Sequence, residues 1–297
     1  MSATPTPTAD VQATIDQLWI YPVKSCAGVS LPEVELTGTG LAYDRSWMVV
    51  DSEGEGVTQR ELPRMALIQP SFRLGQLVLR APGMLALHLA LDAAEAPLRV
   101  RVWDDVVQAY DMGDVAAQWF GDFLGPHAPP ALKRLRLARF DPEARRLCSL
   151  KWTGGRESIT QFADGFGLLV SSTASLDLLN QRLAAAGHAP VDGRRFRANI
   201  VLAGVQAHDE DRVGPLHIHT EAGDAVVEPV KPCARCPMPD IDPDHATTSH
   251  AVGDTLQAYR QDARVNGAVT FGMNAIVTQG DGLMLRAGQH VQAGWIF

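Results

Sequence analysis

The stretch FRANIVLAGV, residues 196–205, is a short apolar run with polar residues at its start, and it predicts a buried β-strand. Arg197 and Asn199 stand at the entry of this strand. A charged side chain at the entry of an apolar strand is costly unless it is paired. We therefore expect an anionic partner to lie close to Arg197.

Strand-like runs continue on both sides of this stretch. They are apolar or alternating, and glycine, proline and aspartate separate them, as is typical of short strands. The runs are LWIYPV (18–23), VSLPEVEL (29–36), SWMVVDSEG (46–54), QLVLR (76–80), VTFGMNAIVTQ (269–279) and LMLRAGQHVQAGWIF (283–297). The segment LRVRVWDDVVQAYD (98–111) predicts a hairpin that turns at its Asp-Asp pair.

Three segments have the apolar spacing of helices. The first is 114–125, where Asp114 is the expected N-cap and Gly125 the expected end; the others are 172–188 and 252–265. Strands outnumber these helices, and no βαβ alternation with a glycine-rich phosphate loop occurs. This disfavours a doubly wound nucleotide-binding fold. The predicted fold class is α+β and strand-rich.

The chain has 297 residues, which is long enough for two domains. Residues 126–160 are rich in proline, arginine and turn formers, so we expect the boundary there and divide the chain into 15–135 and 136–297. Residues 1–14 are predicted to be a disordered tail. The start of the chain is small and polar, without the basic start and apolar core of a secretory signal.

Composition excludes several classes of protein. Hydrophobic residues make up 46% of the chain and charged residues 20%, so a folded core is expected. A net charge of -8 argues against nucleic acid as a partner. No apolar run approaches the roughly 20 residues that cross a bilayer, so no membrane partner is expected. Four cysteines in a chain of this length do not form a disulfide framework, and the expected compartment is a reducing cytoplasm.

Two of the cysteines, Cys233 and Cys236, form a pair in VKPCARCPMPDIDPD (230–244). Prolines flank and follow the pair, which predicts a loop or turn rather than a helix. Four interpretations remain open. The pair could belong to a zinc site with nearby histidines, form a thioredoxin-like redox pair, be chemically inert, or supply one thiolate to a soft, high-valent metal.

Five segments, taken together and in this order, resemble one family: IYPVKSC, TQRELPR, FADGFGLLVSSTASL, FRANIVL and PCARC. They are similar to the MOSC family, which includes the C-termini of molybdenum cofactor sulfurases, amidoxime-reducing components and bacterial relatives. The resemblance extends from about Gln17 to the end of the chain. It implies a β-barrel-like MOSC N-terminal domain followed by a MOSC β-barrel domain with flanking helices, and a cofactor between them.

The resemblance also implies roles for individual residues. Cys236 corresponds to the family's protein ligand to molybdenum, and Asp164 to an acidic residue beside the metal with a role in catalysis. The implied cofactor-binding residues are Lys24, Thr58, Arg60, Arg197, Asn199, Arg235 and Cys236. Ala234 stands where many relatives have serine, so one hydrogen bond to the cofactor is not expected here.

The function implied by this resemblance is that of a molybdenum-cofactor-dependent oxidoreductase. It would reduce small N-hydroxylated substrates such as amidoximes and hydroxylamines. Electrons would come from a separate ferredoxin, flavodoxin or cytochrome, because no iron–sulfur, flavin or haem signature occurs and no cysteine follows Cys236. The alternative is a cofactor carrier or sulfur-transfer module without reductase turnover. Cys26 and Cys148 are expected to be ordinary thiols.

Overall fold

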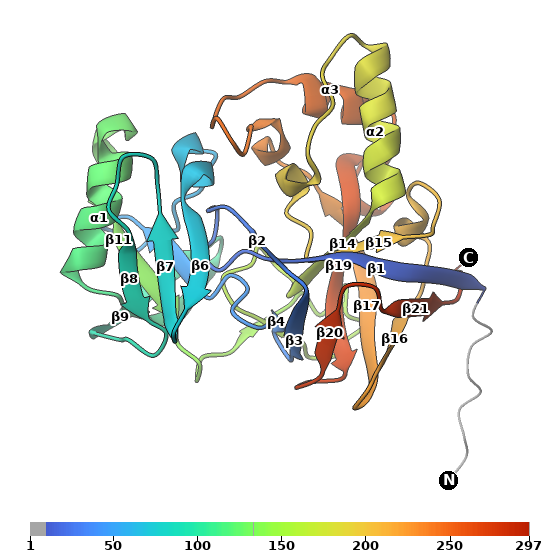
Figure 1. Cartoon of the computed structure of the whole chain (residues 1–297), viewed down its shortest axis with the longest axis horizontal. Coiled ribbons are helices and arrows are strands. Elements are labelled where there is room, and N and C mark those ends of the chain that lie inside the picture. The colour runs from blue at the N-terminus through green and yellow to red at the C-terminus, as the bar shows by residue number, and fades with distance from the viewer. Residues whose placement is uncertain (1–9, 133, 297) are drawn as a thin grey trace.

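The computed structural model describes residues 10–132 and 134–296, and Figure 1 shows two strand-rich parts side by side. Seven strands form a closed barrel in the order β14-β15-β1-β21-β16-β17-β19, because β14 also pairs with β19. Their bounds are β1 Val11–Ile20, β14 Leu168–Ser172, β15 Ile200–Ala203, β16 Leu216–Thr220, β17 Gly223–Ala234, β19 Ala268–Gln279 and β21 His290–Ala293. The strand predicted within 196–205 is β15.

The barrel closes around one apolar core. Alternate residues of β1 face this core: Val11, Ala13 and Ile15 are buried, whereas Gln12 is exposed. This alternation is the period-2 pattern of a strand with one buried face. The prediction that residues 11–14 belong to a disordered tail is therefore wrong, because their apolar side chains are needed to fill the barrel. Residues 1–9 of that predicted tail lie outside the described residues.

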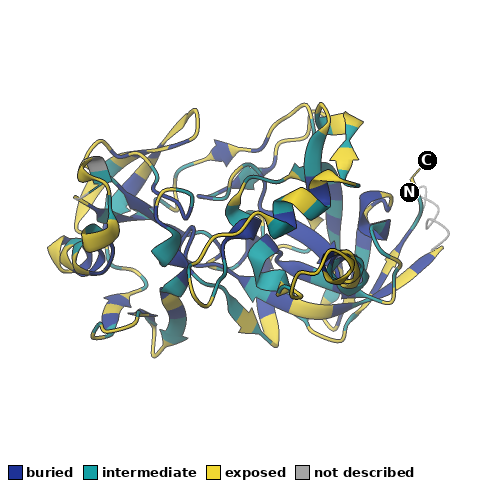
Figure 2. Cartoon of the chain, turned by 90° about the horizontal axis from the view of Figure 1, so that it is seen from above, coloured by how far each residue is buried: buried dark blue, intermediate teal, exposed yellow. Residues whose placement is uncertain are grey.

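The second part contains two smaller sheets. One has the order β5-β11-β10-β9 and the other the order β6-β7-β8, and α1 packs on β11. The bounds are β5 Trp47–Val50, β6 Gln69–Arg73, β7 Gln76–Arg80, β8 Leu87–Ala90, β9 Ala96–Val102, β10 Asp105–Asp111, α1 Asp114–Leu124 and β11 Arg136–Phe140. Apolar residues of both sheets and of α1 share a core. Figure 2 shows buried residues along the strands of both parts and exposed residues in many of the connecting loops.

Short strands complete the structure. They are β2 Val29–Leu31, β3 Glu33–Thr37, β4 Gly40–Leu41, β12 Arg146–Leu147, β13 Ile159–Thr160, β18 Gln261–Asp262 and β20 Met284–Arg286. The strand pairing does not follow the predicted division after residue 135. The N-terminal strand β1 belongs to the barrel, and β11 pairs with β5 and β10. The division itself stays a prediction.

The three helices differ from their predictions in detail. Helix α1 begins at Asp114, but Gly113 occupies the N-cap and no side chain caps the helix, so Asp114 is not the cap. Helix α2, Thr173–Ala185, is capped by Ser172, whose side chain accepts a hydrogen bond from the Ser175 amide. Helix α3 covers only Ala251–Gln257, because the chain then turns into β18.

Within the described ranges, no helix is long and apolar enough to cross a membrane.

Candidate functional site

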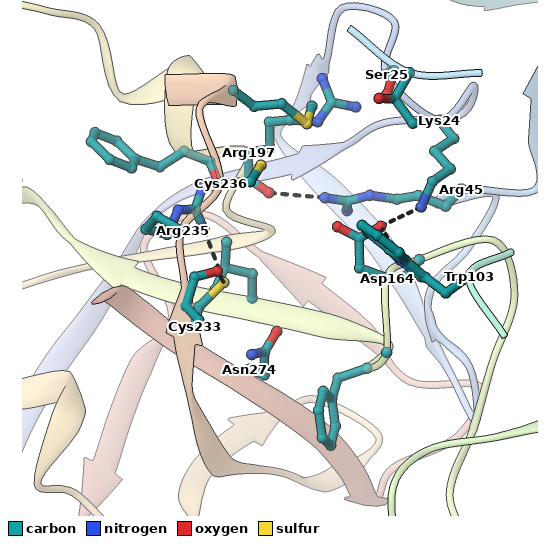
Figure 3. A pocket seen from close by; sticks show the side chains of 18 of the residues that line it. Lys24, Ser25, Arg45, Trp103, Asp164, Arg197, Cys233, Arg235, Cys236 and Asn274 are labelled. Carbon is teal, nitrogen blue, oxygen red and sulfur yellow. Dashed lines mark hydrogen bonds and ion pairs between the residues drawn. The ribbon is translucent and has the colours of Figure 1, made fainter. Parts of the chain in front are cut away.

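A cavity of about 590 Å³ lies between the two parts of the molecule. Its lining includes every residue for which the sequence predicted a role: Lys24, Thr58, Arg60, Asp164, Arg197, Asn199, Arg235 and Cys236. Figure 3 shows Cys233, Arg235 and Cys236 on one side of the cavity and Lys24, Asp164 and Trp103 on the other. The fold therefore brings together side chains from segments that are up to 212 positions apart (236 − 24).

The two cysteines differ in backbone setting. Cys233 lies at the end of β17, whereas Cys236 lies in the loop that follows, before the short 3₁₀ turn Met238–Asp240. The prediction of a loop is therefore confirmed for Cys236 and wrong for Cys233. Strand β17 tolerates its prolines through irregular pairing with β19, whose register shifts around Pro229 and Pro232. The last pair of this ladder is Ala234 with Thr270, two positions before Cys236.

The zinc interpretation of the cysteine pair gains no support. Among the described residues, no group of three or more histidine, cysteine, aspartate or glutamate side chains is arranged to hold a metal. Two of the histidines considered for such a site have carboxylate partners instead. His219 lies 2.8 Å from Asp224, and His245 lies 3.0 Å from Asp242.

Two arginines stack on the same buried aromatic ring. The guanidinium carbons of Arg45 and Arg197 lie 4.5 and 4.2 Å from the ring centroid of Tyr21. Burial raises the pKa of Tyr21 to about 12, although both arginines favour the ionised form. The ring therefore stays neutral and acts as a platform that orients both guanidinium groups beside the cavity.

Arg197 has an unusual backbone and an unsatisfied side chain. Its φ of 58° places it in the left-handed region, at the end of the 3₁₀ turn Gly193–Phe196. Its Nη1 donates a hydrogen bond to the carbonyl of Cys26 at 2.6 Å, but its buried Nη2 has no partner in the structure. Burial and the nearby Arg45 lower the pKa of Arg197 to about 10. Among the described residues no side chain supplies the expected anionic partner to Nη2, which is a buried donor without a hydrogen bond.

Asn199 is largely engaged within the protein. Its Oδ1 accepts hydrogen bonds from the Leu169 amide at 3.1 Å and from Arg45 Nη1 at 3.0 Å, and its Nδ2 donates to the carbonyl of Trp19 at 3.1 Å. Arg45 Nη2 also donates to the carbonyl of Arg197 at 3.0 Å. Asn199 therefore ties β14 to β1 and positions Arg45, which lies beside it at the cavity wall.

Lys24 and Asp164 form an ion pair at the opposite wall. Nζ of Lys24 donates hydrogen bonds to the carboxylate of Asp164 and, at 2.8 Å, to the carbonyl of Phe162. Lys24 is only 8% exposed, and this burial, opposed by Asp164, lowers its pKa. Enclosure by the cavity walls would raise the pKa of Asp164, but Lys24, Trp103 and Arg60 hold it below its usual value. The carboxylate is ionised at neutral pH, and 66% of its side-chain surface is open to the cavity and solvent.

Arg60 is held by its neighbours in the same cavity. Its Nε donates to Oγ1 of Thr58 at 3.1 Å, and Thr58 Oγ1 donates to the carboxylate of Glu61 at 2.7 Å. The guanidinium carbon of Arg60 lies 4.5 Å from the ring centroid of Trp103. Thr58 therefore orients Arg60, and both residues line the cavity.

Several lining residues were not predicted from the sequence. They include Ser25, Arg45, Trp103, Lys231, Met238 and Asn274. No local sequence pattern marks Arg45, because it contacts the ring of Tyr21 and the carbonyl of Arg197, which are distant in the sequence. Lys231 and Asn274 have a weak signal: both are polar residues within otherwise apolar strands, and they pair directly in the barrel. Trp103 is a large aromatic residue next to the turn predicted at Asp104 and Asp105. In the structure the turn lies one residue earlier and includes Trp103, because Val102 pairs with Asp105.

The remaining predictions concern residues away from the cavity. Burial raises the pKa of Cys26 to about 12 and also raises that of Cys148, so both thiols are protonated at neutral pH. The acidic run after the cysteine pair is used within the protein. Asp240 accepts a hydrogen bond from the Gly253 amide at 2.9 Å, and Asp242 pairs with Arg195 at 2.9 Å.

Comparison with known proteins identifies the relatives of this chain. Residues 12–127 match the MOSC N-terminal beta barrel domain, and residues 158–292 match the MOSC domain. The chain is 35% identical over 256 residues to the mitochondrial amidoxime-reducing component 1 of Mus musculus, covering 83% of this chain and 71% of that protein. Identity to the component 1 of Homo sapiens is 34% over 257 residues, covering 84% and 72%.

A more distant relative is the molybdenum cofactor sulfurase of Homo sapiens. It is 28% identical over 276 residues, which cover 87% of this chain but 29% of that protein. The cavity lies where the two matched regions meet, and the two regions cover most of the chain in the order that the sequence resemblance implied. The chain belongs to the MOSC-domain family that contains the mitochondrial amidoxime-reducing components.

Proposed function

We propose that this protein is a molybdenum-cofactor-dependent oxidoreductase that reduces small N-hydroxylated compounds such as amidoximes and hydroxylamines. One observation carries the proposal: eight residues nominated from separate segments of the sequence line a single cavity. The names of its relatives support the same chemistry, since they are amidoxime-reducing components and a molybdenum cofactor sulfurase.

The side chains of the cavity fit an anionic pterin cofactor with a thiol-bound metal. Six cations line it, namely Lys24, Arg45, Arg60, Arg197, Lys231 and Arg235, against the two carboxylates Asp104 and Asp164. The buried Nη2 of Arg197 has no partner within the protein. A phosphate group is costly to desolvate without charge-assisted donors, and a planar guanidinium supplies such donors. Cys236 would hold the metal, since thiolates suit soft metals.

The proposed reaction balances as R–C(NH₂)=N–OH + 2 e⁻ + 2 H⁺ → R–C(NH₂)=NH + H₂O. When bound, the cofactor supplies two-electron redox chemistry, and the protein supplies positioning and protons. The N–O bond breaks and its oxygen leaves as water. Two protons must therefore reach the reacting atoms during each turnover.

Lys24 and Asp164 are suited to deliver and orient these protons. Asp164 is ionised at neutral pH, so its carboxylate accepts a hydrogen bond from the substrate N–OH and aligns the hydroxyl. Lys24 is buried and its pKa is lowered, which makes its ammonium a better proton donor than an exposed lysine. The Phe162 carbonyl and Asp164 hold Nζ in place for this transfer.

The electrons come from a separate donor protein in this proposal, of ferredoxin, flavodoxin or cytochrome type. Two relatives are named amidoxime-reducing components, and the word component indicates one part of a reducing system. We place the protein in the cytoplasm, where its four unpaired thiols stay reduced. The relatives are named as mitochondrial, so cell fractionation with an antibody against this chain tests the compartment.

The test uses protein produced in a host that makes the cofactor. Molybdenum and pterin content are measured first, and benzamidoxime reduction is then followed with an artificial electron donor. Stoichiometric cofactor with sustained formation of benzamidine supports the proposal. Tight cofactor binding without turnover supports instead the carrier or sulfur-transfer module suggested by the sulfurase relative.

A further inference from the structure

The hairpin formed by β9 and β10 carries a bulky aromatic residue at its tip. Val102 pairs with Asp105, so the loop contains only Trp103 and Asp104. Two-residue hairpin loops need positive φ angles and favour glycine or asparagine. Trp103 has a φ of 57° and is 52% exposed. A bulky residue held in this conformation is a reason to look for a function.

Two contacts fix the indole beside the cavity, and a third residue anchors its hairpin. Its Nε1 donates a hydrogen bond to Oδ1 of Asp164 at 3.2 Å, and the guanidinium of Arg60 covers it. Arg146 anchors the hairpin to the same loop. Its Nε donates to Asp105 at 2.7 Å, and its Nη2 donates to the carbonyl of Asp164 at 3.1 Å. The tip therefore keeps a fixed position relative to Asp164.

The indole also places a large aromatic ring directly beside the carboxylate of Asp164. Trp103 lines the cavity, and Figure 3 shows its ring next to Asp164 and across from Cys236. Around it the wall is polar, with Lys24, Arg60 and Asp104. An exposed aromatic ring among fixed polar groups is typical of a recognition site for a ligand with one apolar and one polar end.

We propose that Trp103 is a specificity-determining residue for the substrate. Its ring contacts a planar, conjugated group, while Asp164 binds the attached N–OH, so aryl substrates are preferred over small alkyl ones. This inference rests on the proposed function, because it names the substrate class of the same cavity. The ring contact with Trp103 and the hydrogen bond to Asp164 together select substrates of a certain length that are flat at one end.

The experiment compares benzamidoxime with acetamidoxime, which share the reacting group and differ in the ring. The ratio of their kcat/KM values is measured for the cofactor-loaded wild type, Trp103→Leu and Trp103→Phe. Leucine removes both the ring and the hydrogen bond to Asp164, whereas phenylalanine keeps a ring. The lost hydrogen bond affects both substrates alike and cancels in the ratio. Val106→Ala, on the same hairpin but outside the cavity lining, is the matched control.

The expected result is a fall in the ratio of about 3- to 10-fold in Trp103→Leu, the range of a single aromatic contact. The ratio stays within about twofold of wild type in Trp103→Phe and Val106→Ala. An unchanged ratio in Trp103→Leu, or an equal fall in Trp103→Phe, overturns the proposal. Melting temperature and molybdenum content show whether each variant is folded and loaded.

A binding measurement separates this inference from the proposed function. Dissociation constants of both amidoximes are measured by calorimetry on oxidised, cofactor-loaded protein with no electron donor. If the wild type turns over neither substrate, the proposed reaction fails. Preferential binding of benzamidoxime that is lost in Trp103→Leu still supports the role of Trp103, and equal binding of both compounds by the wild type contradicts it.

Discussion

Nη1 of Arg235 donates a hydrogen bond to Sγ of Cys233 at 2.9 Å, although the two residues are only two positions apart. Nη2 of Arg235 donates a hydrogen bond to the carbonyl of Phe196 at 2.7 Å. In the part of the chain that the structure describes, no hydrogen bond engages the thiol of Cys236, which also lines the cavity. The two thiols are therefore in different chemical settings, one used within the protein and one available to a metal.

This difference predicts that only one of two matched variants loses the metal. Cys236→Ser should reduce molybdenum content at least about tenfold, because the hydroxyl is a poor substitute for a thiolate toward a soft metal. Cys233→Ser should keep most of the metal, since serine can still accept the hydrogen bond from Arg235. Metal analysis by mass spectrometry checks both. Equal loss in the two variants, with zinc in the wild type, would sink the assignment.

A second prediction concerns the free donor of Arg197. Arg197→Lys should weaken retention of the cofactor by roughly 10-fold or more, because an ammonium cannot replace a planar guanidinium with two bonding nitrogens. The measurement is pterin content after dialysis, together with melting temperature. Arg101→Lys is the control, since Arg101 is exposed and pairs with Glu55 at 2.6 Å. Normal pterin retention in Arg197→Lys contradicts a role of Nη2 of Arg197 in holding the cofactor.

The ion pair of Lys24 and Asp164 predicts a particular change in the pH profile. If Lys24 donates a proton, kcat/KM falls as pH rises through the pKa of Lys24, which is below its ordinary value. Asp164 opposes that lowering, so Asp164→Asn should move the alkaline limb to lower pH and reduce the rate. A profile recorded from neutral to alkaline pH checks this. An alkaline limb that moves to higher pH, or does not move, excludes Lys24 as the donor.

The sequence predicted the strand-rich class and nominated residues that the fold brings to one cavity. The strand-rich class followed from local apolar patterns, whereas the site residues were implied by the resemblance of five segments to the MOSC family. The sequence did not predict that residues 11–14 join the barrel, although Val11, Ala13 and Ile15 alternate with polar residues, because this segment directly follows the small, polar start of the chain and was grouped with it. The length of α3 was also overestimated. Its apolar spacing continues beyond Gln257 into residues that form β18, which pairs with β19.

Residues held by long-range contacts were beyond the reach of local patterns. Arg45 is positioned by Tyr21, Asn199 and the carbonyl of Arg197, which come from two other places in the chain. Asn199 was nominated as a cofactor contact, and the structure adds a role that the sequence did not indicate, because its amide joins two strands. Such roles depend on which atoms already have partners, and only coordinates supply that information.

The proposed electron donor gives a further prediction. Pure, cofactor-loaded protein supplied with NADH or NADPH and benzamidoxime should show no sustained turnover, because each cycle consumes two electrons that this chain must receive from a partner. Addition of a reduced dye, or of a donor protein with its reductase, should start the reaction. Product formation over many turnovers is the measurement. Sustained turnover with the nicotinamide alone would contradict the need for a donor protein.

A buried carboxyl group away from the cavity makes stability depend on pH. Glu210 is only 1% exposed, and its oxygens accept hydrogen bonds from Ser175 at 2.6 Å and Ser172 at 2.9 Å. Burial, with a contribution from Asp211, raises the pKa of Glu210 from 4.5 to about 6. Between these two pH values the native state binds more protons than the unfolded state. Stability from this group is therefore present below pH 4.5 and is lost as pH rises through about 6.

Glu210→Gln removes this titration while keeping a side chain of the same shape, so the variant should gain stability relative to wild type as pH rises from 4.5 to 7. The shift corresponds to roughly 2 kcal/mol, at about 1.4 kcal/mol for each pH unit. His208, whose burial lowers its pKa to about 4, acts in the opposite direction but is present in both proteins and cancels in the difference. Denaturant unfolding at several pH values measures the effect, with the exposed Glu143→Gln as control. A stability difference between Glu210→Gln and wild type that is constant from pH 4.5 to 7 would show that Glu210 titrates alike in the folded and unfolded states.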